Sequence, residues 1–333
     1  MLDTSNKYMK GILIILTFLL IGCSPEPPSL ETYQLNDPSL NLDLVAWEPD
    51  IIAPIAIDFD RKGRLWVAEM PDYMPDINGE KEDIPAGRIV ILEDLDGDGV
   101  MEKSKVFMKN IHHLRAIRLF RNGILYADDP NLYFTEILND KASKTIVIDS
   151  TYALGGNIEH KPNGLIKGLD QCFYSAKSNY RYCYDGGAWN KEAVFFRGQW
   201  GITQDENGRL FTNDNSNLLY GDYFLPATLN KNKYIRKVAG MNANLAKSRR
   251  VYPVQATAIN RGYSEGALDE NNFVVNVTSS CGPHIYRDQE IGSAYQGDAF
   301  ICVPEANLIK QLEVDVNELL PSCLLYTSPS PRD

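Results

Sequence analysis

Residues 55–69 read IAIDFDRKGRLWVAE, and the same order of residue types returns three more times along the chain. An apolar run is followed by a polar turn that contains Gly, and then by an aliphatic and aromatic run. The returns are AIRLFRNGILYADD at 116–129, GLIKGLDQCFYSAK at 164–177 and GITQDENGRLFTNDN at 201–215. Glycine supplies the positive φ angle of a tight hairpin, and aspartate caps such turns. Each copy therefore predicts two antiparallel strands joined by a short turn.

The spacing of these copies predicts how the hairpins assemble. Their aromatic residues follow one another after about 60, 48 and 37 positions. These aromatic residues are Trp66, Tyr126, Phe173 or Tyr174, and Phe211. Irregular all-β repetition at this period is typical of a β-propeller, in which each blade is a four-stranded sheet. We predict an all-β propeller of about six blades over residues 41–321. A β-sandwich is the alternative, but sandwiches do not usually repeat one turn formula four times.

Composition excludes several classes of function. The chain has 333 residues, a hydrophobic content of 44% and a net charge of -11, which describe a globular and acidic protein. Nucleic-acid binding needs a basic surface, and no long basic cluster is present, so we expect no nucleic-acid partner. The chain also lacks the GxSxG, P-loop and GxGxxG motifs. Acyl transfer, NTP hydrolysis and NAD chemistry are therefore disfavoured.

The N-terminus has the features of a lipoprotein leader. Two lysines precede the apolar run GILIILTFLLIG at 11–22, which is short for a membrane span and typical of a signal peptide. Cys23 follows directly, as in a bacterial lipobox, so we predict a signal peptide at 1–22, lipidation of Cys23 and a tether at 23–40. Because Ser24 is not the aspartate of inner-membrane retention, the prediction favours the outer membrane of the cell envelope, with the domain periplasmic or surface-exposed. An uncleaved anchor helix is the alternative.

The C-terminal residues resemble a cloning or sequencing artefact. Residues 323–333 read CLLYTSPSPRD, which resembles a translated frame of a common transposase sequencing adapter. We therefore expect residues 322–333 to be adapter-derived, and the natural protein to continue past Pro321. The propeller would then be truncated at its C-terminus.

Cysteine usage agrees with an oxidising compartment. Four cysteines remain when Cys23 and the cysteine of the adapter-like tail are set aside. An even number outside the cytoplasm favours disulfides, and each pair flanks an apparent hairpin. We predict local pairing, with free buried thiols as the alternative. The predicted pairs are Cys172–Cys183 and Cys281–Cys302.

An acidic turn is a candidate metal site. The stretch EDLDGDGVME at 93–102 has carboxylates at alternate positions around glycines, an arrangement that can surround one Ca²⁺. The predicted ligands are Asp94, Asp96, Asp98 and Glu102. Lys105 stands where an EF-hand has its bidentate glutamate, so a solvated acidic turn is equally compatible with the sequence.

Two segments place polar residues just before an inner strand of a blade. His160 precedes Asn163 and the third hairpin, while Arg197 and Gln199 precede the fourth. In a propeller such positions surround the mouth of the central channel, so a base and a guanidinium from neighbouring blades can converge there. The alternative is that His160 bonds nearby backbone and Arg197 braces one blade against the next.

These segments resemble a known enzyme family. HKPNGL at 160–165 and RGQWGI at 197–202 resemble the pyrroloquinoline-quinone (PQQ) dependent sugar dehydrogenases of the glucose/sorbosone type. The run from VAWEP at 45–49 through NRGY at 260–263 to CGP at 281–283 resembles the membrane-bound dehydrogenase domain of bacterial proteins. In those proteins the domain often precedes helical repeats and a c-type cytochrome.

The resemblance implies a quinoprotein dehydrogenase that oxidises a sugar or alcohol and passes electrons to a c-type cytochrome. His160 would be the general base, and Arg197 would stabilise the reduced quinone, with Asn163 and Gln199 beside the cofactor. PQQ and Ca²⁺ are the implied cofactors. The chain departs from the family pattern at Gly198, where the sugar dehydrogenases carry asparagine, and no residue clearly replaces the carboxylate that orients the histidine.

Two other functions fit the same fold. The propeller could be a non-catalytic module that binds glycan or protein, or a Ca²⁺-dependent lactonase-like hydrolase. The pair His112-His113 has no Cys, Asp or Glu at ligand spacing, so the sequence favours it only weakly as a metal site.

Overall fold

The computed structural model describes residues 26–314, except 231, 233, 236, 237, 254, 255 and 257–264. The predicted signal peptide, the lipidation site Cys23, the NRGY segment and the adapter-like tail at 322–333 lie outside these described residues. The rest of the predicted tether begins the described chain.

The four predicted hairpins are present, and each forms the two innermost strands of one sheet. The described residues form five antiparallel sheets, four of four strands and one of three, each strand pairing with the next along the chain. The first sheet contains β1 (Pro54–Phe59), β2 (Leu65–Glu69), β3 (Gly87–Glu93) and β4 (Lys103–Ile111). The second contains β5 (Ala116–Phe120), β6 (Gly123–Ala127), β7 (Leu132–Leu138) and β8 (Lys141–Asp149).

The remaining sheets follow in the same way. The third contains β9 (Asn163–Lys167), β10 (Cys172–Ala176), β11 (Ser178–Asp185) and β12 (Ala188–Arg197). The fourth contains β13 (Ile202–Gln204), β14 (Leu210–Asp214), β15 (Asn217–Gly221) and β16 (Ala243–Asn244). The fifth contains β17 (Cys281–Ile285), β18 (Ala299–Val303) and β19 (Leu308–Leu312). Three short 3₁₀ helices complete the described elements, at η2 (Ile158–His160), η3 (Ser293–Tyr295) and η4 (Pro304–Ala306).

The repeated turn formula acts as predicted in the first and fourth hairpins, whereas in the second and third the positive φ angle falls on Arg121 and Gln171 and not on glycine. In the first hairpin, Asp60 Oδ1 accepts from the backbone of Lys62 and Arg64 at 2.8 and 3.1 Å, and Gly63 has a φ angle of 80°. Asp205 caps the fourth hairpin through Arg209 at 2.8 Å. The carboxylate replaces hydrogen bonds that a tight turn cannot make within its own backbone. Local turn chemistry of the predicted kind therefore begins the first and fourth sheets.

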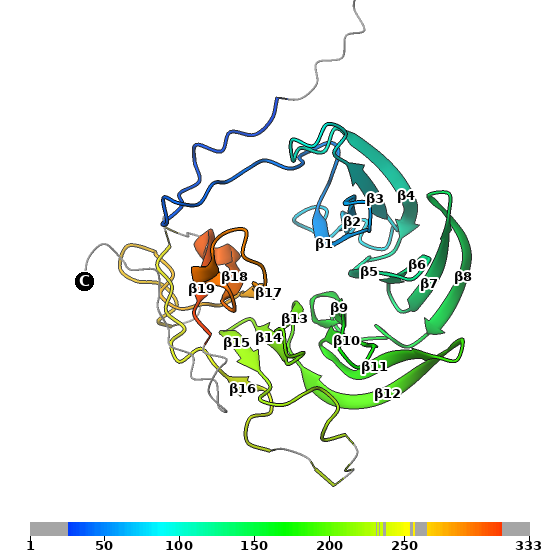
Figure 1. The fold of residues 1–333 in the computed structure, drawn as a ribbon. Coiled ribbons are helices and arrows are strands. Elements are labelled where there is room, and N and C mark those ends of the chain that lie inside the picture. The colour runs from blue at the N-terminus through cyan, green and yellow to red at the C-terminus, as the bar shows by residue number, and fades with distance from the viewer. Residues whose placement is uncertain are drawn as a thin grey trace, which may run out of the picture.

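The sheets pack face to face around a ring, as Figure 1 shows. Neighbouring inner strands contact one another from β1 to β5, β9, β13 and β17 in turn. Trp66 is 1% exposed and packs with Ile117 and Tyr126 of the second sheet. Phe173 packs in the same way against the second sheet from the third, and Phe211 against the fifth from the fourth. The repeated aromatic residues thus fill the spaces between blades, which defines a β-propeller.

The ring is open between the fifth and first sheets, where residues 26–50 cross the gap (Figure 1). The Asp37 carboxylate accepts a hydrogen bond from the Tyr295 hydroxyl, which ties this segment to the fifth sheet. Ala46 and Ile51 then cover the apolar face of the first sheet, against the cluster that contains Val67. The N-terminal segment therefore covers a face of the first sheet on which the described residues place no further blade.

Two predictions need correction. The count of about six blades is not confirmed, because the described residues form five. Cys172 and Cys183 form the predicted disulfide, whereas Cys281 and Cys302 are free thiols, although β17 and β18 place them directly opposite each other.

No helix within the described residues is long and apolar enough to cross a membrane.

Candidate functional site

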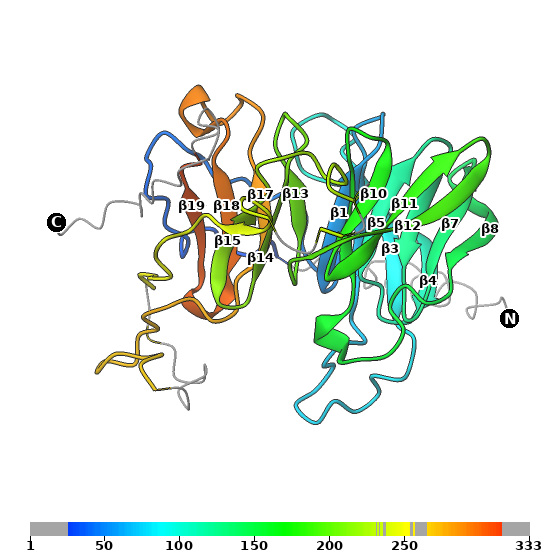
Figure 2. The ribbon, with the colours of Figure 1, turned by 90° about the horizontal axis from the view of Figure 1, so that it is seen from below.

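The two ends of the ring are built differently. At one end lie the short turns β1–β2, β5–β6 and β9–β10, which we call the turn end. At the other lie the connections 112–115 and 128–131 and the two long connections 70–86 and 150–162, which together we call the loop end. Figure 2 shows the connections 70–86 and 150–162 extending below the sheets, the latter with η2.

The loop end buries an aspartate and a histidine against each other. Asp72 and His113 are each only 2% exposed, and the backbone N–H of His113 donates to Asp72 Oδ2 at 2.8 Å. The other carboxylate oxygen, Asp72 Oδ1, has no hydrogen-bond partner, and neither ring nitrogen of His113 has one. Buried polar atoms without partners cost roughly 1–3 kcal/mol each, and such atoms are usually completed by an ordered water molecule, an ion or a ligand.

A second histidine lies beside this pair. The rings of His112 and His113 have centroids 4.0 Å apart, and His112 Nε2 lies 3.2 Å from the Glu82 carbonyl oxygen. Asp72 and the two histidines each offer one ligand atom, and the three atoms lie within 4.8 Å of one another. Burial lowers the pKa of His113, and the neighbouring His112 lowers it further. The His113 imidazole is therefore neutral near pH 7, with a lone pair available.

An arginine with unused donors lies in the same region. Arg115 is 1% exposed, and its Nη1 donates to the Ile158 carbonyl at 3.2 Å. Its Nε and Nη2 atoms have no hydrogen-bond partner. Burial lowers the pKa of Arg115, while the charges of Asp129, Asp128 and Asp72 act in the opposite direction. The loop end thus presents a buried guanidinium whose remaining N–H groups can bind an oxygen-rich ligand.

Ion pairs hold the surrounding connections together. The Lys161 ammonium contacts the Asp129 carboxylate, which also lies 3.7 Å from His113 Nδ1. The Tyr73 hydroxyl donates to Glu159 Oε1 at 2.7 Å and links two of the connections. These contacts position η2 beside the buried histidines.

His160 lies on η2 with an exposed side chain. Its Nε2 is 4.0 Å from Glu159 Oε2, and its sequence neighbours Ile158 and Lys161 are those that contact the buried groups. The candidate base therefore lies at the loop end. Its catalytic role stays a prediction.

Arg197 lies elsewhere, between the third and fourth sheets. Its Nε donates to Asp222 Oδ2 and its Nη1 to the Phe195 carbonyl, both at 2.7 Å. Arg197 is 3% exposed and Asp222 is 1% exposed. Within the described part of the chain, no hydrogen bond or ion pair joins Arg197 to His160. The structure therefore places Arg197 in a buried ion pair that braces two blades.

Asn163 and Gln199 also connect neighbouring blades. Asn163 Nδ2 donates to the carbonyls of Lys161 and Gln199 at 3.1 and 2.5 Å, and its Oδ1 accepts from Gly201 N at 2.9 Å. These bonds use the donors and acceptor of the Asn163 side chain. They support a structural role, and the predicted contact of both residues with a cofactor stays a prediction.

The acidic turn gathers the four predicted carboxylates. Ligand atoms of Asp94, Asp96, Asp98 and Glu102 lie within 4.8 Å of one another. Asp94 accepts from the backbone of Gly97 and Gly99 at 2.6 and 3.0 Å, and these bonds lower its pKa. Lys105 points to another blade, where it donates to the Asp140 carbonyl at 2.9 Å. The turn keeps its shape through its own hydrogen bonds, and Ca²⁺ binding there stays a prediction.

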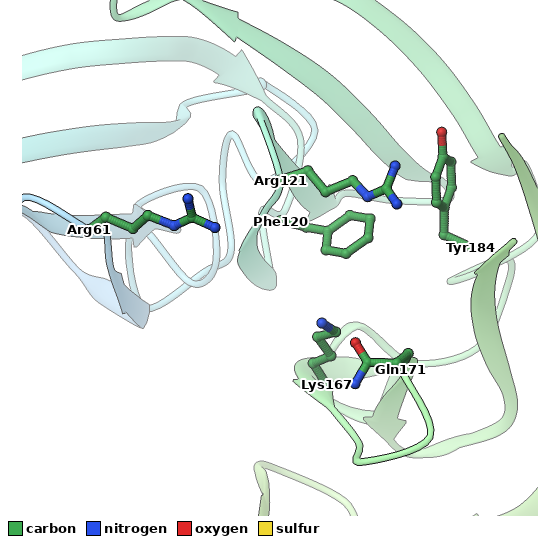
Figure 3. A pocket seen from close by; sticks show the side chains of 6 residues that line it. All are labelled: Arg61, Phe120, Arg121, Lys167, Gln171 and Tyr184. Carbon is green, nitrogen blue, oxygen red and sulfur yellow. The ribbon is translucent and has the colours of Figure 1, made fainter. Parts of the chain in front are cut away.

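The turn end carries a pocket of about 300 Å³. Figure 3 shows its six lining side chains, which come from three neighbouring blades. They are Arg61, Phe120, Arg121, Lys167, Gln171 and Tyr184. The Arg121 guanidinium lies 4.6 Å from the Tyr184 ring centroid, and the Lys167 ammonium lies 5.4 Å from that of Phe120. The lining has three cations and no carboxylate, which suits an anionic ligand.

Within the described residues, the chain is a β-propeller of five blades whose loop end buries polar groups without partners. The chain belongs to the family described as a domain of unknown function, DUF7133, which matches residues 28–320. No curated protein matches the chain.

Several solved structures are similar in fold. An oxidoreductase of the glucose dehydrogenase type from Thermus thermophilus is 12% identical, with 84% of each chain covered and a TM-score of 0.48. A family AA12 carbohydrate-active enzyme from Trichoderma reesei is 12% identical, with 84% of this chain and 82% of that one covered and a TM-score of 0.46. The PQQ domain of pyranose dehydrogenase from Coprinopsis cinerea is 16% identical, with a TM-score of 0.35. The match covers 50% of this chain and 45% of that domain, so the chain spans less than half of its length.

Sequence reasoning missed the central residues of the loop end. It found the two histidines but no carboxylate near them, because Asp72 lies 40 residues before His112. Arg115 stood in a strand-like stretch with no motif. The available signal was the polar residues of HHLR at 112–115, which lie in the connection between two predicted hairpins.

Proposed function

We propose that the chain is the catalytic propeller of an oxidoreductase that oxidises a hydroxyl group of a sugar or other alcohol at the loop end. The observation that carries this proposal is the buried Arg115 guanidinium, with two N–H groups unpartnered. Polar groups are kept buried and unsatisfied where a ligand is to bind them. The site therefore suits a planar, oxygen-rich electron acceptor.

A PQQ-type quinone fits part of this donor set. It supplies the carbon that accepts hydride from the substrate when it is bound. Arg115 can hold two oxygen atoms of an ortho-quinone or a carboxylate, because its fork of N–H groups is rigid and planar. Arg197 is already paired with Asp222, so we assign the guanidinium role to Arg115. Arg115 would also stabilise the negative charge that the acceptor gains.

His160 would take the proton of the substrate hydroxyl. An imidazole nitrogen can accept a proton and release it again, which suits a general base. Its ring is exposed, so the proton can pass to solvent after transfer. Glu159, at 4.0 Å and held by Tyr73, would stabilise the imidazolium that forms.

The test is dye-linked oxidation of a panel of sugars and alcohols by the full chain after addition of PQQ and Ca²⁺. We expect Arg115→Gln to lower turnover by about 100-fold, the effect of losing one preorganised donor to a developing charge. His160→Ala should lower it as well. Arg121→Gln at the turn end is the matched control and should retain turnover.

PQQ binding is measured separately, by titration of protein fluorescence, so that folding and chemistry are distinguished. The proposal is overturned if the folded protein binds no PQQ, or if Arg115→Gln binds and oxidises as the unmodified chain does. The melting temperature of each variant verifies that it is folded.

A second candidate function is the binding of an anionic glycan, and the turn-end pocket favours it. Three cations and two aromatic rings line that pocket, and sugar rings pack on aromatic faces while their acidic groups pair with cations. A Ca²⁺-dependent lactonase-like activity would instead need the acidic turn. A chelator would abolish it in the absence of any quinone.

We also propose that the protein is a lipoprotein of the cell envelope, supported by the lipobox-like residues before Cys23. A c-type cytochrome is the proposed electron acceptor. In the replacement Cys23→Ser, labelling with a fatty-acid analogue should disappear.

A further inference from the structure

Three side chains of the loop end have no part in the proposed oxidation. Asp72 comes from the β2–β3 connection, and His112 and His113 come from the β4–β5 connection. Their ligand atoms lie within 4.8 Å of one another. The grouping is independent of the acidic turn at 94–102, which lies in a different connection.

The hydrogen bonds of these side chains leave one lone pair free on each. The contact of His112 Nε2 with the Glu82 carbonyl, at 3.2 Å, requires a proton on Nε2 and so leaves Nδ1 unprotonated in the neutral ring. A bond from the far nitrogen to a backbone carbonyl is the usual outer contact of a metal-binding histidine. It sets the tautomer and the ring orientation before any ion arrives.

The other two residues are buried and incomplete. Asp72 Oδ2 accepts from His113 N at 2.8 Å and from Ala86 N at 3.5 Å, while Oδ1 accepts nothing. Both ring nitrogens of His113 lack a hydrogen bond at 2% residue exposure. A core histidine would normally bond a carbonyl or a water molecule, so this pair is short of a partner.

We propose that Asp72, His112 and His113 bind one divalent transition-metal ion. Two imidazoles and one carboxylate are ligands for Zn²⁺, Fe²⁺ and related ions, whereas Ca²⁺ prefers an all-oxygen shell. Three protein ligands leave coordination positions open, as in catalytic sites. This site goes beyond the proposed oxidation, because ion binding requires neither a quinone nor a substrate.

The surrounding charges fit an ion with open positions. Asp128 and Asp129 add negative charge near the group, and Lys161 offsets one of them through its ion pair with Asp129. The Arg115 donors without partners lie in the same region and could bind an oxygen atom held by the ion. The ion would also fasten the 70–86 connection to the β4–β5 connection.

The experiment is Zn²⁺ binding to the metal-stripped full chain. Equilibrium dialysis with elemental analysis gives the stoichiometry, in millimolar Ca²⁺ so that the acidic turn is saturated. We expect one Zn²⁺ per chain, and at least a tenfold loss of affinity in His112→Ala and in Asp72→Asn. Co²⁺ should give a visible absorption band that both variants lose.

The controls separate this site from others. Asp96→Asn, in the acidic turn, should bind Zn²⁺ as the unmodified chain does. His112 is only half-buried, so His112→Ala should keep the fold, which circular dichroism verifies. The proposal is overturned if the unmodified chain binds no Zn²⁺, if His112→Ala binds it unchanged, or if Asp96→Asn loses it equally. Dye-linked oxidation is not part of this readout, so failure of the proposed oxidation leaves the result intact.

Discussion

At the turn end, charged side chains lie on short hairpins at the protein surface, whereas at the loop end they lie buried beneath longer connections. Arg61 and Arg121 are exposed and line an open pocket with Lys167. Asp72 and Arg115 are 2% and 1% exposed. The hairpins of the turn end follow one repeated formula, while the connections of the loop end do not repeat.

This difference separates binding by surface charge from binding by preorganised groups. Exposed cations keep their hydration and attract any anion weakly, with an effect that salt screens. Buried groups have lost their water, so their partners must match them in position and charge. We therefore expect replacement of a buried charged side chain at the loop end to lower stability strongly, and replacement of an exposed cation at the turn end to change stability little.

The largest effect should come from Asp129→Ala at the loop end. This change leaves the buried Lys161 ammonium without its partner, and breaking a buried ion pair costs about 3–5 kcal/mol. Urea unfolding at pH 7 measures the loss. Arg61→Gln, at the turn end, should change the free energy of unfolding by no more than about 0.5 kcal/mol. Equal losses in the two variants would remove the distinction between the ends.

The second effect concerns the disulfide beside the turn-end pocket. Cys172 and Cys183 are 11 residues apart and lie next to Gln171 and Tyr184 of the pocket lining. Replacing both cysteines with serine should lower the free energy of unfolding by about 3 kcal/mol, because the unfolded chain gains entropy. Zn²⁺ binding at the loop end should stay unchanged at temperatures where the variant is folded. Loss of Zn²⁺ binding there would show that the two ends are coupled.

The third prediction concerns how the contribution of Asp149 to stability depends on pH. Asp149 ends β8 and directly precedes the 150–162 connection. Burial of Asp149 would raise its pKa, but bonds from Lys191, Tyr182 and Thr151 outweigh burial and lower the pKa to about 2. A carboxylate with a lowered pKa stabilises the fold above about pH 4, and this contribution disappears as pH falls through 2. Asp149→Asn should therefore cost about 2 kcal/mol at pH 7 and almost nothing at pH 2.

Urea unfolding of both forms from pH 7 to pH 2 tests this dependence. A constant difference between Asp149→Asn and the unmodified chain at every pH would contradict it. The same pH series with Arg61→Gln and the unmodified chain should give two parallel curves of unfolding free energy against pH.

The smallest effect should come from Arg61→Gln on ligand binding at the turn end. If the pocket binds an anionic glycan, removal of one of three cations should weaken binding about tenfold, or about 1.4 kcal/mol. Isothermal titration with a uronic-acid oligosaccharide at two salt concentrations measures it. Arg115→Gln should leave this affinity unchanged, and a loss in that variant instead would place the glycan at the loop end.

The local features of the fold could be predicted from the sequence. The Asp60 turn, its counterpart at Asp205 and the aromatic residues between the blades follow from patterns within about 15 residues. The Cys172–Cys183 disulfide was predictable for the same reason, because one hairpin holds both cysteines. The blade count was less accessible, because no clear copy of the turn formula follows the fourth hairpin and the number of further blades could not be counted from the sequence.

The candidate site was less predictable, because its contacts join segments far apart in the chain. The residue types of His160 and Arg197 suggested a shared pocket, but Arg197 pairs with Asp222, 25 residues downstream. Asp72 lies beside the two adjacent histidines in space but precedes them in the chain by strands β3 and β4. No periodicity or motif marks such a pairing.

The sequence by itself determined the all-β hairpins and their assembly into a propeller, because turn chemistry and strand alternation act between near neighbours. The tertiary structure alone decided that Asp72, His112, His113 and Arg115 share one buried region, and that Cys281 and Cys302 remain thiols. The reason is physical: the packing of sheets around the ring sets which connections meet, and burial then decides which polar groups are left without a partner.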